Sequence, residues 1–184
     1  TQVRNALSES DPKKMLAKVP DFDPKQPPLL FAKARLPISD GHGVGTRGTG
    51  LWYSNKAEVK AITGGQGIPY RNNYPVFQKW AKQIVEIDFS QGGHAVQADK
   101  ALAKQIVKKH LEAEFPAEFF TSRGKQLPKG KCNLDAMKEW RIQNRLTWHH
   151  HQGIGEQMLL LPRDLHANVP HTGGHAISKG THSL

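Results

Sequence analysis

Alternating and periodic apolar positions along the chain predict a domain that mixes helices and strands. Residues 84–89 (IVEIDF) alternate apolar and acidic side chains, a pattern typical of a half-buried strand. Residues 97–111 place apolar side chains at helical spacing, which predicts an amphipathic helix packed on a core. The other face of this helix is basic and carries Lys100, Lys104, Lys108 and Lys109. We expect solvent to cover this basic face, with tracking of phosphates as the alternative.

The last third of the chain predicts a strand–turn–strand–helix unit. Asn133 can cap a short helix over residues 134–141. Residues 145–150 and 157–161 are apolar enough to form two strands, joined by a glycine-containing turn. Pro162 suits the first position of a helix that ends at Asn168. These elements together predict a ββα unit.

The first part of the chain gives weaker signals. Residues 1–40 are punctuated by prolines and predict a linker or an arm wrapped over a neighbouring surface, with one short helix ending at Lys18. Residues 41–50 are rich in glycine, but they lack the lysine and the preceding strand of a Walker phosphate loop, so we expect a flexible loop. We predict three parts: the arm at 1–40, an upstream α+β part at 41–131 and a ββα core at 132–184.

Composition narrows the function classes. The chain has 184 residues and a formal net charge of +10, which favours a polyanionic partner, with nucleic acid first and an acidic neutralising protein second. Cys132 is the single cysteine, so an internal disulfide and a cysteine-rich zinc site are both excluded. No segment is apolar for long enough to span a membrane, and no signal peptide is visible. Because the chain starts at Thr1 without a methionine, we expect either a piece of a longer protein or a trimmed chain.

Histidines are concentrated near the C-terminus. Imidazole is the commonest transition-metal ligand, and it also moves protons near neutral pH. Six histidines lie within residues 146–176: His149, His150, His151, His166, His171 and His175. This stretch predicts a metal site, acid–base chemistry, or both.

Two sequence blocks carry a resemblance to a known group of enzymes. Residues 148–150 (WHH) and residues 161–174, which contain LPRDLH and PHTGG, resemble the HNH/endonuclease VII superfamily of ββα-metal nucleases. More narrowly, the chain is similar to bacterial toxin nucleases named for a Trp-His-His motif. The resemblance extends over residues 42–176. It implies an α+β fold with a ββα-metal, treble-clef-like C-terminal core and an upstream α+β extension.

The resemblance also implies residue roles. His150 matches the general base, His149 and His166 match metal ligands, and His171 matches the last family histidine, either a ligand or a phosphate contact. Further members of the site could be His175, as the alternative to His171, together with His151 and Gln157. Gln157 is the nearest candidate for the middle position of the HNH motif, with Leu159 at the alternative register. Arg163, Arg145 and Arg141 are candidates for contacts with the substrate.

Strand and helix geometry places two conditions on these roles. Adjacent residues of a strand face opposite sides, so a regular strand groups His149 with His151 rather than with His150. The assigned roles require the strand to end or twist at the histidines. His166 and His171 are five residues apart, about 140° around an ideal helix. Because Pro170 also disfavours a continuous helix, His171 must follow a bend.

The function implied by the resemblance is hydrolysis of DNA phosphodiester bonds with low sequence specificity. One divalent metal ion (zinc, magnesium, manganese or nickel) would act as the Lewis acid. The chain would be the C-terminal toxin domain of a larger secreted antibacterial effector, delivered by a bacterial secretion system into the target-cell cytoplasm and neutralised by a cognate immunity protein. The alternatives are a ribonuclease toxin on the same scaffold and a non-catalytic zinc-binding module that binds nucleic acid.

Overall fold

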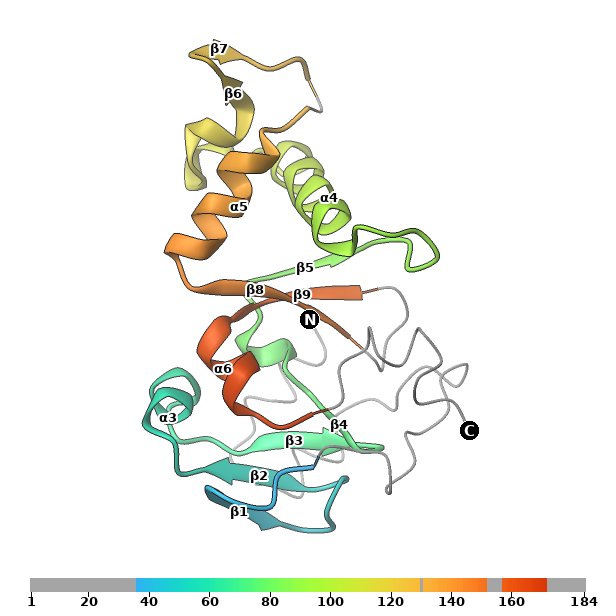
Figure 1. Cartoon of the computed structure of the whole chain (residues 1–184), viewed down its shortest axis with the longest axis vertical. Helices are drawn as coiled ribbons and strands as arrows, with labels where there is room; N and C mark the ends of the chain where they lie inside the picture. Colours follow the sequence, from blue (N-terminus) through green and yellow to red (C-terminus); the bar gives the residue numbers. More distant parts are fainter. Residues whose placement is uncertain (1–35, 130, 152–156, 172–184) are drawn as a thin grey trace.

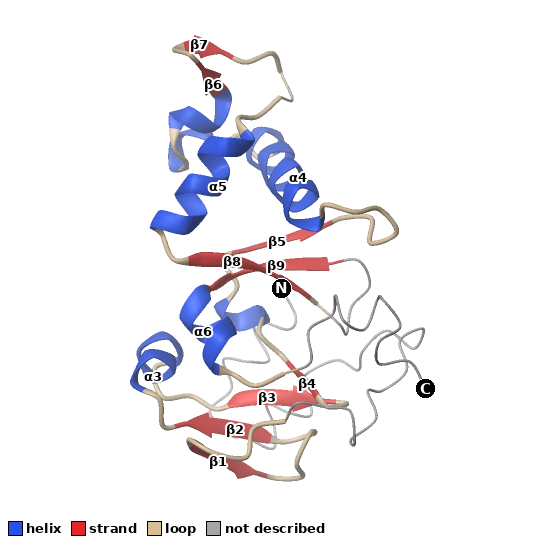
Figure 2. Cartoon of the chain, in the orientation of Figure 1, coloured by secondary structure: helices blue, strands red, loops and turns tan. Residues whose placement is uncertain are grey.

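A central three-stranded sheet divides the molecule into two layers of packing (Figure 1). The computed structural model describes residues 36–129, 131–151 and 157–171. The central sheet has the order β5-β9-β8, with every pair antiparallel. Its strands are β5 (Gln83–Glu86), β9 (Gln157–Pro162) and β8 (Leu146–His150). An α+β fold was predicted, and the structure confirms it (Figure 2).

One face of the central sheet packs against two helices. These are α4 (His94–Lys108) and α5 (Leu134–Gln143), which lie above the sheet in Figure 1. Trp148, Met158 and Leu160 point into this layer and meet Leu102 and Ile106 of α4. The layer continues into short elements: η3 (Glu112–Glu114), η4 (Ala117–Phe120), β6 (Thr121–Ser122) and β7 (Lys125–Gln126).

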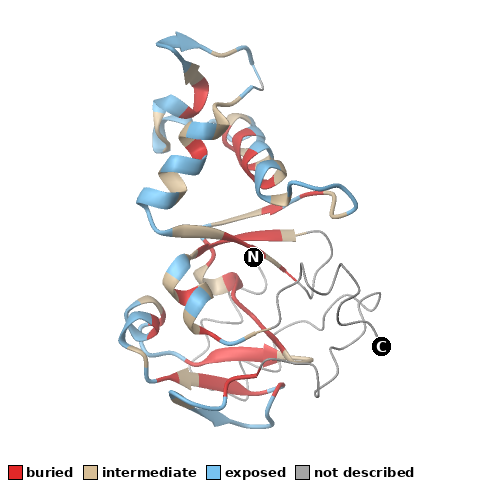
Figure 3. Ribbon diagram, viewed as in Figure 1, coloured by how far each residue is buried: buried red, intermediate tan, exposed pale blue. Residues whose placement is uncertain are grey.

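The other face packs against α6 and a second sheet. Leu159 and Leu161 of β9 join Leu165 of α6 (Arg163–Asn168) and Phe77 in a separate core, so β9 is buried on both faces (Figure 3). The second sheet has the order β1-β2-β3-β4. Its strands are β1 (Gly41–Val44), β2 (Leu51–Ser54), β3 (Ile68–Arg71) and β4 (Tyr74–Pro75), accompanied by α3 (Ala57–Thr63) and η2 (Gln78–Trp80).

Local signals set the ends of several predicted elements. The Asn133 side chain accepts from the backbone N–H of Ala136, which confirms the predicted cap of α5. The two predicted strands of the ββα unit and the C-terminal helix appear within one residue of their expected ends, and Pro162 directly precedes the helix. The strand predicted over residues 84–89 ends three residues early, at Glu86. The amphipathic helix starts earlier than expected, at His94, because Gly93 adopts a positive φ of 71° and turns the chain into α4.

The expectation of a flexible loop over residues 41–50 is wrong for its first half. Gly41–Val44 pairs with Leu51–Ser54 in an antiparallel ladder. A Cβ atom at Gly41 would lie 2.5 Å from the Trp52 ring, so glycine here allows the close approach of β1 to that ring. The division of the chain into three parts stays a prediction, and residues 1–35 lie outside the described part.

Candidate active site

The two packing layers separate the adjacent histidines of β8. His149 pairs across the ladder with Leu159 and faces α6, whereas His150 pairs with Met158 and faces α4. The strand therefore stays regular through both residues. It ends at His150, at an edge of the sheet. The regular pairing sends the two rings to opposite faces of the sheet, so the twist that would group them is absent and their roles stay predictions.

Three histidines converge on the α6 side of the sheet. His149, His166 and His171 each offer a ring nitrogen, and these nitrogens lie within 4.8 Å of one another. Their ring centroids are 4.9 to 5.1 Å apart. His149 comes from β8, His166 from α6, and His171 from the segment after the helix. The expected bend before His171 is present, because α6 ends at Asn168.

Backbone carbonyls fix how His171 enters this cluster. Its Nδ1–H donates to the carbonyl oxygen of Val169 at 2.7 Å, which leaves Nε2 as the nitrogen with the lone pair. The hydroxyl of Tyr70 donates to the carbonyl of Pro170 at 2.7 Å and ties this segment to β3. A carbonyl partner of this kind sets the tautomer and ring direction of a metal-binding histidine.

Burial favours the neutral form of two imidazoles of the cluster, those of His149 and His166. His149 is 2% exposed, and burial lowers its pKa well below the usual value, with further lowering by the neighbouring His171 and His166. Burial, followed by His171, lowers the pKa of His166 to about 4. Phe77 presents its ring at steep angles to both His149 and His171, with centroids 5.2 and 5.6 Å away. Neutral imidazole nitrogens are the form that binds metal.

This donor set fits a catalytic metal. Three histidine nitrogens around one centre match the usual ligand count of a catalytic zinc site, in which the fourth position is kept for water or substrate. Nitrogen donors suit zinc or nickel better than magnesium, which prefers oxygen.

His150 is the last residue of β8 and lies on the face of the sheet opposite His149. Its charge is the smallest of the causes that lower the pKa values of His149 and His166, after burial and His171. On the α4 side its Nε2 lies 2.7 Å from Nδ1 of His94. Phe89 packs against both rings, with centroids 5.2 Å from His150 and 5.3 Å from His94.

Two other candidates of the site have different surroundings. His151 is 2% exposed and contacts the side chain of Gln78, and burial lowers its pKa to about 4. Gln157 begins β9 and accepts the backbone N–H of His151 through its carbonyl at 2.9 Å. His175 lies outside the described residues, as does most of the turn between β8 and β9.

The arginine candidates differ in how they are held. Arg141 makes a two-pronged contact with the buried carboxylate of Asp99, at 2.9 and 2.8 Å. Arg145 pairs with Asp164 at 2.6 Å on the surface, and Arg163 is exposed. Arg163 and Arg145 are exposed to solvent, whereas Arg141 is mostly buried. Contacts of all three with a substrate stay predictions.

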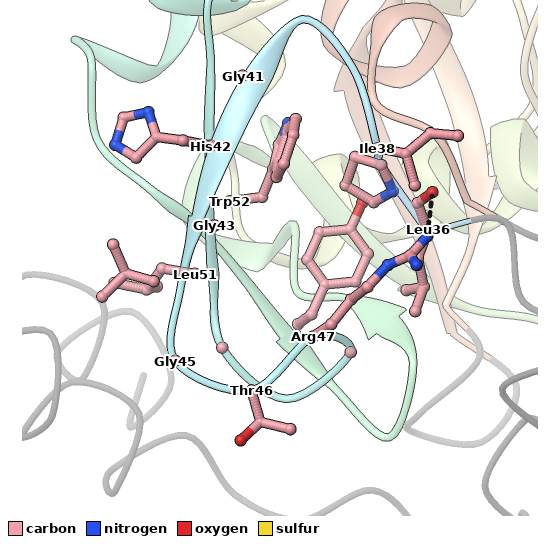
Figure 4. Close-up of a pocket in the computed structure, with 15 residues that line it drawn as sticks. Leu36, Ile38, Gly41, His42, Gly43, Gly45, Thr46, Arg47, Leu51 and Trp52 are labelled. Atoms are coloured by element: carbon pink, nitrogen blue, oxygen red, sulfur yellow. Dashed lines mark hydrogen bonds between the residues drawn. The ribbon is translucent and has the colours of Figure 1, made fainter.

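A separate cavity of about 390 Å³ lies in the second sheet, around the glycine-rich turn (Figure 4). Trp52 and Tyr70 form part of its wall, and Arg47 reaches the carbonyl oxygen of Leu36 at 3.5 Å. No histidine of the cluster lines it. The glycines thus serve a tight hairpin, with positive φ at Gly45 and Gly48.

Sequence reasoning missed Phe77 and His94. Phe77 packs against His149 and His171, two of the candidate metal ligands. His94 contacts His150, the candidate base. Neither carries a local motif, and His94 read from sequence alone is an isolated histidine.

One comparison with known proteins identifies the family of the chain. Residues 67–173 match the family model described as the DNase/tRNase domain of colicin-like bacteriocin, and the match covers more than half of the chain. No curated protein and no solved structure matched the chain. Among the described residues, no helix has the length and apolar character needed to cross a bilayer. The chain belongs to the family of DNase/tRNase domains of colicin-like bacteriocins and is a nuclease toxin domain of that type.

Proposed function

We propose that this domain is a metal-dependent endonuclease of the ββα-metal type that hydrolyses DNA. The observation that carries the proposal is the convergence of His149, His166 and His171 beside His150 at the end of β8. A metal bound by the three imidazoles would supply a Lewis acid for the scissile phosphate. The imidazole of His150, which is next in the chain but faces the other side of the sheet, would supply the base at the end of the same strand.

The chain's own residues then have distinct tasks. His150 removes a proton from a water molecule, whose oxygen forms the new bond to phosphorus while the bond to the 3′ oxygen breaks. The 3′ oxygen takes a proton from solvent, which leaves a 3′ hydroxyl and a 5′ phosphate. His149 and His166 hold neutral nitrogens toward the metal position because burial keeps them unprotonated.

DNA is an adequate substrate, because this route needs no 2′ hydroxyl. The formal net charge of +10 suits a phosphate backbone. Arg163, the first residue of α6, is exposed, as is Arg145, which pairs with Asp164. Low sequence specificity follows if binding rests mainly on phosphates. The same basic surface suits an acidic immunity protein that would protect the producing cell. Secretion and action inside a target cell are part of this proposal.

RNA is the second candidate, because the family description includes tRNase domains as well as DNases. Cleavage of RNA through its own 2′ hydroxyl would leave a cyclic phosphate and would not require the metal. The termini of the products therefore separate the two candidates.

The test is cleavage of supercoiled plasmid and of tRNA by the purified domain, with Zn²⁺, Ni²⁺, Mn²⁺ or Mg²⁺ and with EDTA. We expect metal-dependent plasmid nicking that is lost in His150→Ala and in His166→Ala and retained in His42→Ala, a histidine of the second sheet. Intact plasmid under every metal condition would overturn the proposal. Full activity of His150→Ala would exclude His150 as the base, whereas zinc binding without any cleavage by the wild type would favour a non-catalytic zinc-binding module.

A further inference from the structure

His94 is linked to His150 by a short contact between their rings. Nδ1 of His94 lies 2.7 Å from Nε2 of His150, although the two residues are 56 positions apart in the chain. His94 is the first residue of α4, directly after Gly93 with its positive φ. The N-terminus of α4 thus places the His94 imidazole next to the C-terminal residue of β8.

A carbonyl group determines the direction of this hydrogen bond. Nε2 of His94 lies 3.2 Å from the carbonyl oxygen of Phe89, which can only accept. Nε2 of His94 therefore carries a proton, and in the neutral ring Nδ1 is the acceptor. His150 then donates from Nε2–H, so the lone pair of His150 lies on Nδ1.

We propose that His94 is a positioning residue that fixes the tautomer and ring direction of His150. The inference rests on the proposed function, in which His150 takes the proton of the attacking water. With Nε2–H held by His94, Nδ1 is the atom that accepts this proton. The water oxygen bonds to phosphorus and the bond to the 3′ oxygen breaks, as in the hydrolysis above. His94 itself gains and loses no proton in this step.

The surroundings of His94 are built to keep it in place. The side-chain amide of Gln97 donates to the carbonyls of Asp88, Gln91 and Gly92, at 3.1, 3.2 and 3.0 Å. Its oxygen accepts from the backbone N–H of Asp88 at 3.2 Å. One side chain of α4 thereby clamps the loop that supplies the Phe89 carbonyl.

The ring of Phe89 adds a second restraint. It stacks on His94 at an interplanar angle of 23° and meets His150 at 65°. An apolar ring at position 94 could reproduce this packing, but it could not accept the proton of His150. Packing and hydrogen bonding can therefore be separated by substitution.

The test compares His94→Asn with His94→Phe. Asparagine keeps an acceptor near the place of Nδ1 and loses the ring, whereas phenylalanine keeps the ring and loses the acceptor. We expect His94→Phe to lower kcat for plasmid cleavage by about 10–100-fold, the range known for outer partners of metal-site residues, with KM within about twofold and bound metal unchanged. His94→Asn should recover most of the loss. A purely structural role predicts the reverse order and would overturn the inference, as would equal activity of both variants and wild type.

Nitrogen-15 NMR of the imidazoles gives a readout that does not depend on cleavage. The His150 signals, assigned by their loss in His150→Gln, should report the Nε2–H tautomer in the wild type and a mixture in His94→Phe. His42→Phe, in which the ring stacked on Tyr53 is altered, should leave them unchanged. An Nδ1–H tautomer in the wild type would overturn the inference. Wild-type protein that cuts no nucleic acid yet shows the Nε2–H tautomer would instead overturn the proposed function and the catalytic meaning of the contact.

Discussion

The indole N–H of Trp148 donates to the carboxylate of Asp99 at 2.8 Å, inside the layer between α4 and the central sheet. The same carboxylate receives two hydrogen bonds from Arg141 of α5. Asp99 of α4 thus links α5, through Arg141, to β8, through Trp148. This contact gives Trp148 an anchoring task that a hydrophobic ring without an N–H could fill only in part.

Replacing Asp99 should destabilise the fold strongly. In Asp99→Ala, the Arg141 side chain, 13% exposed, loses its counter-charge and the Trp148 N–H loses its acceptor. Loss of one partner of a buried ion pair lowers the free energy of unfolding by about 3–5 kcal/mol. We expect a value near the lower end of this range because the Arg141 side chain is partly exposed to solvent. Urea unfolding would measure it. Glu139→Ala, at an exposed position of α5, is the control and should change the free energy of unfolding by less than about 0.5 kcal/mol; an equal effect of both variants would contradict the anchoring task.

Zinc should raise the melting temperature of the wild-type domain. A ligand that binds only the folded state at about 100 times its Kd adds about 2.7 kcal/mol to stability. His166→Ala and His171→Ala each remove one of the three converging nitrogens, so the added stability should fall sharply in both. Thermal unfolding with and without zinc, alongside His42→Ala, measures the effect. Undiminished stabilisation of His166→Ala would show that zinc binds elsewhere.

Acidic pH should lower the free energy of unfolding of the metal-free domain, because buried histidines must take up protons when the chain unfolds. Burial lowers the pKa of His151 from 6.5 to about 4, so the unfolded chain binds this proton more readily than the folded one. The stabilising contribution is complete above pH 6.5 and is lost as the pH falls toward 4. At about 1.4 kcal/mol per pH unit, the full loss from this residue is about 3 kcal/mol.

The variant His151→Gln checks the origin of that dependence. Glutamine does not titrate, so the free energy of unfolding should fall less steeply between pH 6.5 and pH 4.5 than in the wild type. Urea unfolding in EDTA at several pH values gives both slopes. Identical slopes would mean that His151 is not held neutral by burial.

Arg163→Ala should weaken binding of duplex DNA and make it less sensitive to salt. Removal of one phosphate contact lowers the slope of log K against log salt by about 1. Fluorescence anisotropy in a His150→Ala background avoids cleavage during the measurement. Lys60→Ala, at an exposed position of α3, should leave the slope unchanged. If both variants gave the same slope of log K against log salt, Arg163 would not contact DNA phosphates.

Local chemistry explains which parts of the site could be predicted from sequence. Three of the correct predictions depend only on residues close together in the sequence, so they need no knowledge of the tertiary structure. These are the cap by Asn133, the apolar alternation in β5 and the proline before α6. The position of His171 after a bend also followed from Pro170. The hairpin at Gly41–Val44 was missed because its reason lies in a contact with Trp52 on the next strand.

The sequence by itself determined the ββα unit and its supply of imidazoles, because hydrogen bonding and apolar spacing along the chain specify strands, helix and turns. Only the tertiary structure decided which imidazoles meet. The sheet pleat sends His149 to His166 and His171 and sends His150 to the end of α4. Contacts such as those of His94 with His150 and of Asp99 with Trp148 join residues 56 and 49 positions apart. They depend on how two layers pack on one sheet, for which the chain carries no local pattern.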